Sequence, residues 1–391
     1  MQTSPKVRPS TMLATSVGGL PLDCCVYNAS GPRTGSVEAL SRIGSSAAGA
    51  VLSKSCTLAR QDGNPLPRAV SDLPLGEGRC VGSFNSEGLP NLGVDYYTCK
   101  ETVEALAQFG KPYIVSLSGL SLEDNLVMLA RAMDSPGVSA VELNLACPNI
   151  PGKPIIAYDF EEMDRVLAAV TSLSCAGNKP LGVKLAPYFD VPHFDLAAEI
   201  LAKHPIRFVT TTNTIGNALF VDADNECSVI APKGGLGGLG GGFIKHTALA
   251  NVRLLSQKLA ERGRADLSVV GVGGVSSGRD AFELILCGAS AVQVGSCYWT
   301  EGPGCFARIA EELRVLMEAK GYRGIEDFRG KLKAHTRSSA SKRKTDVPRR
   351  EGAASGEPAK DWTSVLLVVI AALVAIIAYL LLGGGGLGCR V

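Results

Sequence analysis

The stretch SVVGVGGVSSGRDAFELILCGASAVQVGS, residues 268–296, contains the pattern that decides the fold. Its apolar runs at 268–272 and 291–294 have the length of buried strands, and the segment 280–287 between them has helical periodicity. Glycine follows each run, at Gly273 and Gly274 and again at Gly295, as a sharp turn out of a strand requires. The stretch therefore predicts a strand, a helix and a second strand parallel to the first.

The same alternation extends back through the chain. Further apolar runs lie at 25–29, 49–53, 113–118, 139–145, 181–185 and 208–212, and helical periodicity recurs at 122–133, 160–173, 194–203 and 249–261. Eight strands that alternate with helices predict an α/β fold of the (β/α)8 type, a TIM barrel, within residues 1–336. A doubly wound open sheet is the alternative, but no GxGxxG with a later acidic residue follows the first run.

The composition excludes several classes of protein. The 391 residues are 46% hydrophobic, and 39 basic side chains nearly balance 37 acidic ones, which excludes a disordered chain and predicts no nucleic-acid partner. The 12 cysteines have no paired spacing, so we expect reduced thiols in an intracellular protein. The 4 histidines have no zinc-motif spacing, and no metal site is predicted.

The composition changes abruptly near residue 337. Residues 337–361 hold seven basic and four acidic side chains with almost no large apolar ones, and they predict a flexible basic linker. The block VLLVVIAALVAIIAYLLL at 365–382 follows, and as a helix it would span roughly 27 Å, close to the thickness of a bilayer core. We expect a transmembrane helix at 362–383 and a short tail at 384–391, with the barrel facing the cytosol because basic residues precede the span. A buried core helix is the alternative.

A polar side chain comes directly after nearly every predicted strand. Barrel enzymes carry their active sites at this end of the strands. Lys54 and Lys184 end apolar runs and need an anionic partner there, such as a phosphate, a carboxylate or a reduced flavin ring. Four asparagines offer donors and acceptors that suit a pyrimidine-like ring, although each could equally serve a turn: Asn85, Asn144, Asn149 and Asn213.

Glycines after the last two runs predict a phosphate site. In a barrel this corner commonly holds a phosphate, and Gly273, Gly274, Gly295 and Ser296 leave the backbone N–H groups open to it; tight turns alone are the alternative. The run GGLGGLGGG at 234–242 is read as a loop beside the cofactor, with a linker as the alternative. Cys147 follows the run 139–145, and no histidine is nearby in sequence. Two roles remain open for its thiol, that of a general base and a purely structural one.

Several motifs, taken in order, resemble those of class 1A dihydroorotate dehydrogenases. They are SKSCT (53–57), DGNPLPR (62–68), NSEGLPNLG (85–93), ELNLACPNIPGKP (142–154), GVKLAPYFD (182–190), TNTIGN (212–217), GGLGG (237–241) and VQVGS (292–296). The resemblance implies that Cys147 removes the C5 proton of dihydroorotate while a hydride passes from C6 to FMN. It also implies a homodimer and fumarate, reduced to succinate at the same site, as the electron acceptor.

The resemblance carries binding roles over to individual residues. It implies substrate binding by Lys54, Asn85, Gly88, Leu89, Asn144, Asn149, Asn213 and Thr214. It implies FMN binding by Ala29, Ser30, Lys54, Ser55, Asn85, Asn144, Lys184, Thr212, Gly241, Val272, Gly273, Gly274, Gly295 and Ser296.

The chain departs from the family pattern in a few places. Glu87 stands where methionine is usual and adds a negative charge beside an anionic substrate, and residues 77–81 look like a short insertion. The C-terminal anchor is the largest departure, because relatives of this class are soluble. A membrane quinone as acceptor, and a related FMN enzyme that acts on uracil-type rings, are therefore kept as alternatives.

Overall fold

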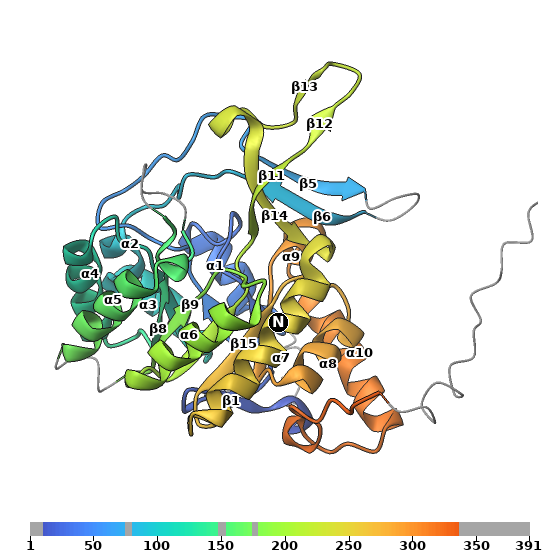
Figure 1. Ribbon diagram of the computed structural model, residues 1–391. Helices are drawn as coiled ribbons and strands as arrows, with labels where there is room; N and C mark the ends of the chain where they lie inside the picture. Colours follow the sequence, from blue (N-terminus) through green and yellow to red (C-terminus); the bar gives the residue numbers. More distant parts are fainter. Residues whose placement is uncertain (1–10, 75–79, 148–153, 174–178, 336–391) are drawn as a thin grey trace, which may run out of the picture. The chain divides into compact units, whose positions relative to one another are not determined.

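The eight predicted runs form one parallel, eight-stranded sheet. The computed structural model describes residues 11–74, 80–147, 154–173 and 179–335 (Figure 1). The barrel strands are β3 (Val26–Asn28), β4 (Val51–Leu52), β7 (Tyr113–Leu117), β8 (Ala140–Asn144), β9 (Leu181–Lys184), β10 (Phe208–Thr211), β15 (Ser268–Val272) and β16 (Ala291–Val294). They pair in parallel in the order β3-β16-β15-β10-β9-β8-β7-β4. The order follows the chain around the sheet, so the barrel prediction is confirmed and the doubly wound alternative is wrong.

A buried asparagine closes the barrel between β3 and β4. The side-chain Nδ2 of Asn28 donates to the carbonyl of Leu52 at 2.6 Å, and the N–H of Leu52 donates back to Asn28 Oδ1 at 2.9 Å. One rung lower, the N–H of Gly49 donates to the carbonyl of Val26 at 2.8 Å. The side-chain amide of Asn28 thus makes the hydrogen bonds that backbone groups would otherwise make between β3 and β4. For this reason β4 can be as short as two residues.

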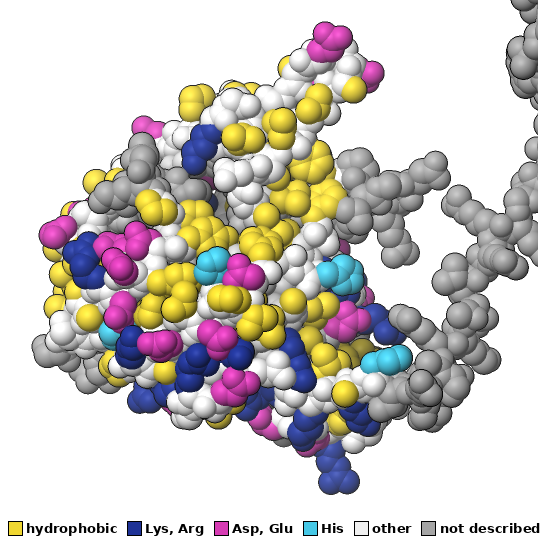
Figure 2. Space-filling model, viewed as in Figure 1, with side chains coloured by type: hydrophobic (Ala, Val, Ile, Leu, Met, Phe, Trp, Pro, Cys, Tyr) yellow, Lys and Arg dark blue, Asp and Glu magenta, His cyan; other side chains and the backbone are white. Residues whose placement is uncertain are grey.

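Helices cover the outside of the barrel (Figure 1). They are α1 (Val37–Gly44), α2 (Val94–Thr98), α3 (Lys100–Ala107), α4 (Leu122–Asp134), α5 (Phe160–Ser172), α6 (Val191–Lys203), α7 (Lys245–Glu261), α8 (Gly278–Cys287), α9 (Ser296–Glu301) and α10 (Gly304–Ala319). The helix predictions for α4 to α8 are confirmed, but α6 begins three residues early because Asp190 Oδ1 accepts from the N–H of His193 at 3.0 Å. Their apolar faces pack on the strands, and on the face in Figure 2 the charged side chains gather over these helices.

A small antiparallel sheet lies over one end of the barrel, at the top of Figure 1. It has the order β11-β14-β6-β5 and consists of β5 (Ala69–Pro74), β6 (Cys80–Asn85), β11 (Ile215–Leu219) and β14 (Leu236–Gly241). Two short hairpins complete the strands, β1 (Thr15–Val17) with β2 (Leu20–Leu22) and β12 (Val221–Asp222) with β13 (Cys227–Ser228).

The glycine-rich run belongs to this sheet, which corrects its prediction as a loop. β14 pairs with β6 from Gly238 opposite Asn85 to Gly241 opposite Gly82. A Cβ at Gly237 would come within 2.8 Å of the carbonyl oxygen of Asn85, and one at Gly240 within 2.8 Å of Ser83 Oγ. The glycines therefore permit a close approach of two strands.

Within the described residues, no helix is both long and apolar enough to cross a bilayer. The predicted linker at 337–361, the predicted span at 362–383 and the tail at 384–391 lie outside the described residues.

Candidate active site

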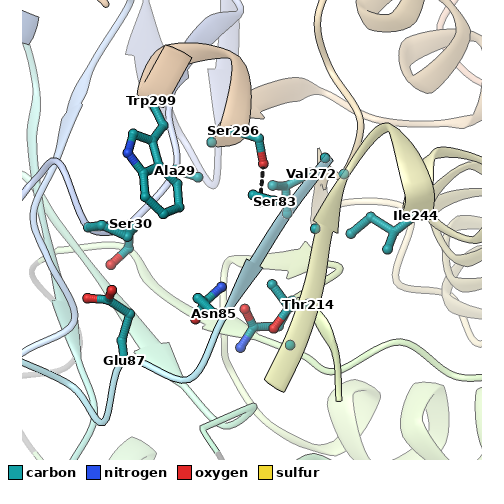
Figure 3. Close-up of a pocket in the computed structure, with 18 of the residues that line it drawn as sticks. Ala29, Ser30, Ser83, Asn85, Glu87, Thr214, Ile244, Val272, Ser296 and Trp299 are labelled. Atoms are coloured by element: carbon teal, nitrogen blue, oxygen red, sulfur yellow. Dashed lines mark hydrogen bonds between the residues drawn. The ribbon is translucent and has the colours of Figure 1, made fainter. Parts of the chain in front are cut away.

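A cavity of about 770 Å³ opens between the carboxyl ends of the barrel strands and the small sheet. Figure 3 shows its wall, with Asn85 and Ser83 contributed by β6, Val272 by β15 and Trp299 by α9. All but one of the predicted site residues line it: Ala29, Ser30, Lys54, Ser55, Asn85, Gly88, Leu89, Asn144, Cys147, Lys184, Thr212, Asn213, Thr214, Gly241, Val272, Gly273, Gly274, Gly295 and Ser296. Asn149, the remaining one, lies outside the described residues.

The backbone that leads to Cys147 is fixed on both sides by asparagine side chains. Asn144, at the end of β8, accepts from the N–H of Ala146 at 3.1 Å through its Oδ1, and its Nδ2 donates to Ser55 Oγ at 3.3 Å. Asn213 Nδ2 donates to the carbonyl of Ala146 at 3.1 Å. The half-buried thiol of Cys147 is therefore presented to the cavity from a held backbone rather than from a free loop.

Two buried lysines face the same cavity. Lys54 is 6% exposed and Lys184 is 4% exposed, and neither ammonium group has a hydrogen bond or an ion pair with any residue that the structure describes. Burial lowers the pKa of both side chains; Glu87, followed by Cys147, opposes the shift at Lys54, and Glu142 opposes it at Lys184. Two partly desolvated cations of this kind form a site for anionic groups.

Beneath Lys184 the barrel interior contains a polar network that the sequence analysis missed. Glu142 is fully buried, and its Oε2 accepts from Thr210 Oγ1 at 2.7 Å and from Gln293 Nε2 at 2.9 Å. Gln293 Nε2 also donates to the hydroxyl of Tyr27 at 3.3 Å. The sequence did contain a signal for this network, namely a polar residue at an inward-facing position of each apolar run. Such positions can be identified because successive side chains of a strand alternate between its two faces.

The glycine corner has a backbone that only glycine adopts without strain. Gly273 and Gly274 have φ of 133° and 73°, and a Cβ on them would come within 2.7 Å of the Ala248 Cβ and 2.6 Å of the Lys245 Cβ. Across from them Ser296 Oγ lies 2.6 Å from Ser83 Oγ (Figure 3). Gly273, Gly274 and Ser296 line the same cavity as Lys184, whose ammonium has no hydrogen bond or ion pair within the described residues; this set fits a phosphorylated cofactor whose ring becomes anionic.

The family model described as dihydroorotate dehydrogenase matches residues 12–317. The chain belongs to the dihydroorotate dehydrogenase family. Dihydroorotate dehydrogenase A (fumarate) of Lactococcus lactis subsp. cremoris is 47% identical over 309 residues, which cover 78% of this chain and 94% of the relative. The putative dihydroorotate dehydrogenase A (fumarate) of Streptococcus uberis is 48% identical over 319 residues, 82% of this chain and 97% of the relative.

Among solved structures, the dihydroorotate dehydrogenase of Eimeria tenella in complex with ferulenol superposes with a TM-score of 0.69. The two chains are 19% identical, and the match covers 84% of this chain and 90% of the other. This likeness supports the barrel fold, while the closer sequence relatives establish the family that the motifs suggested.

Proposed function

We propose that this chain oxidises dihydroorotate to orotate, the dehydrogenation step of pyrimidine biosynthesis, with FMN as cofactor and fumarate as electron acceptor. The observation that carries the proposal is the placement of Cys147 in one cavity with Lys54 and Lys184, two buried lysines without a hydrogen bond or ion pair among the described residues. The names of the relatives, which specify fumarate, support the acceptor.

The residues divide the chemistry between them. The Cys147 thiolate takes the proton from C5 as the C5–H bond breaks, and the hydride leaves C6 with both electrons of its bond, so that a C5–C6 double bond forms. Bound FMN would supply the acceptor for this hydride and the two electrons that reduce fumarate in the second half-reaction. Lys54 neutralises the substrate carboxylate, Asn144 and Asn213 orient the ring, and Lys184 balances the negative charge of the reduced cofactor.

Anaerobic stopped-flow absorbance tests the acceptor. The full-length protein in detergent is bleached with dihydroorotate and then mixed separately with fumarate and with a short-chain quinone. We expect fumarate alone to restore the flavin absorbance rapidly. Reoxidation by quinone alone would replace fumarate with a membrane acceptor, the second candidate that the apolar block at 365–382 favours. A failure of dihydroorotate to bleach the flavin would overturn the proposed oxidation itself.

We also propose that residues 362–383 anchor the chain in a membrane with the barrel in the cytosol. The apolar composition of 365–382 and the basic residues before it support this placement. Deleting residues 337–391 should move the protein from the membrane pellet to the supernatant while leaving its turnover within about twofold, because a linker of this length does not need to pack on the barrel. Ultracentrifugation followed by activity assay checks both statements.

The control for the truncation deletes residues 384–391 alone and should remain in the pellet. Loss of turnover in the longer truncation, with an intact fold by circular dichroism, would mean that the tail contributes to the site.

We further propose a homodimer, for which exposed apolar side chains of the small sheet and its hairpin provide a surface: Leu219, Val221 and Leu236.

A further inference from the structure

Glu87 places a carboxylate in the wall of the cavity, although the substrate proposed to bind there is itself an anion. Glu87 lies on the loop that follows β6 and also holds Gly88 and Leu89, and its side chain is only 13% exposed. In Figure 3 the carboxylate of Glu87 points toward Ser30 across the cavity. A charge in this position acts on whatever anion binds beside Lys54.

The loop around Glu87 is closely packed, so the carboxylate has a defined position. The N–H of Asn64 donates to the carbonyl of Glu87 at 2.9 Å, and Asn64 Nδ2 donates to the carbonyl of Ser86 at 2.8 Å. A Cβ at Gly63 would come within 2.7 Å of the carbonyl oxygen of Glu87. The side chain therefore extends from a backbone that neighbouring loops hold on two sides.

The cation nearest to Glu87 neutralises it only in part. Arg68 Nε lies 3.9 Å from Glu87 Oε1, while its Nη1 donates to the carbonyls of Asp62 at 2.8 Å and of Asn64 at 3.0 Å. Among the charged neighbours of Lys54, Glu87 exerts the largest effect on that ammonium group. The carboxylate thus divides its attraction between Arg68 and Lys54, and it withdraws part of the positive field that an anionic ligand would meet.

From this charge arrangement, and resting on the proposed function, we propose that Glu87 sets the charge selectivity of the site. Coulomb repulsion grows with the charge of the ligand, so Glu87 weakens the binding of a dianion such as fumarate more than that of a monoanion such as orotate. Glu87 thereby sets the relative affinity of one cavity for the ligands of the two half-reactions. A structural role alone, in which Glu87 only holds Arg68, would change the affinity for both ligands by the same factor.

Equilibrium binding to the oxidised holoenzyme tests this proposal without turnover. The flavin absorbance change on adding orotate gives its dissociation constant, and competition against orotate gives that of fumarate. Glu87→Gln preserves the shape of the side chain and removes its charge, and we expect it to tighten orotate about fivefold and fumarate by a larger factor, up to about 25-fold. Glu87→Asp, which retains the charge, should remain within about twofold of the wild type for the ratio of the two constants.

The methyl ester of orotate is a matched uncharged probe, and its affinity should be the same in the Gln variant and the wild type. Equal factors for orotate and fumarate, or an equal gain for the ester, would overturn the charge selectivity while leaving the proposed oxidation intact. A wild-type flavin spectrum that does not respond to orotate would overturn the proposed function and this inference with it.

Discussion

Replacing Cys147 by serine should slow the reduction of the flavin by dihydroorotate by about two to four orders of magnitude, the usual contribution of a general base. A hydroxyl is a far weaker base than a thiolate at neutral pH, and serine needs a neighbouring base to act in its place. No histidine is among the described residues that line the cavity. Anaerobic stopped-flow absorbance of the flavin measures the rate directly.

The matched control for this variant is Cys297→Ser in the same cavity wall. Cys297 Sγ donates to Glu301 Oε1 at 3.2 Å, a bond that a hydroxyl can replace. Although Cys297 is buried, serine is similar in size and keeps this hydrogen bond, so the control should reduce its flavin within about threefold of the wild-type rate. If Cys147→Ser retained its flavin and the wild-type rate, Cys147 would not be the base.

The barrel could be predicted because each strand carries its own signal. A buried parallel strand is a short apolar run, and the glycines or polar residues after it mark the turn, so all eight runs were found without knowledge of their neighbours. The first residue of a helix was harder to predict where the capping residue lies outside the periodic segment. Asp190 begins α6 before the first apolar residue of the pattern, and Ser277 likewise begins α8.

The small sheet could not be predicted because its signal is not local. β14 is mostly glycine and shows no alternation of apolar and polar residues, and its partner β6 lies far away in the sequence. What makes the run a strand is the space that glycine leaves beside Phe84 and Ser83, which only the folded chain reveals. Because this sheet forms one wall of the cavity, the position of Glu87 opposite Ser30 was equally hidden.

The buried network around Glu142 was missed for a related reason. In sequence Glu142 and Gln293 each interrupt an apolar run as single polar residues, with about 150 positions between them. Only closure of the barrel brings them within 2.9 Å, where each satisfies part of the other. The site residues at strand ends were accessible because the fold itself collects them at one rim, whereas the interior pairs depend on register.

Replacing Lys184 by methionine should lower the midpoint potential of the bound flavin by about 40–90 mV. A unit positive charge beside an anionic ring in a partly desolvated site contributes about 2–4 kcal/mol, and for a two-electron couple about 30 mV corresponds to 1.4 kcal/mol. Methionine has similar length without the charge, so the ring keeps its packing. Spectroelectrochemical titration of the purified holoenzyme measures the potential.

The pH dependence gives the same prediction a second, independent readout. Burial lowers the pKa of Lys184, and the attraction of Glu142 opposes that shift. Below this lowered pKa the ammonium is charged and supports the reduced ring; as the pH rises through it the proton leaves and the support is lost. The wild-type potential should therefore fall more steeply with pH there, at a lower pH than for an ordinary lysine, whose pKa is about 10.4.

The methionine variant should lack this alkaline step, and Lys184→Arg, which keeps its charge at every accessible pH, should lack it as well while retaining most of the potential. A change in packing alone would lower the potential equally in both variants, and any alkaline step of the wild type would persist in both of them. The combination of a low potential in methionine, a near-normal one in arginine and an alkaline step only in the wild type is specific to a titrating ammonium at this position. An unchanged potential in the methionine variant would assign the charge on the reduced ring to another group, with Lys54 the other buried cation in the described wall of the cavity.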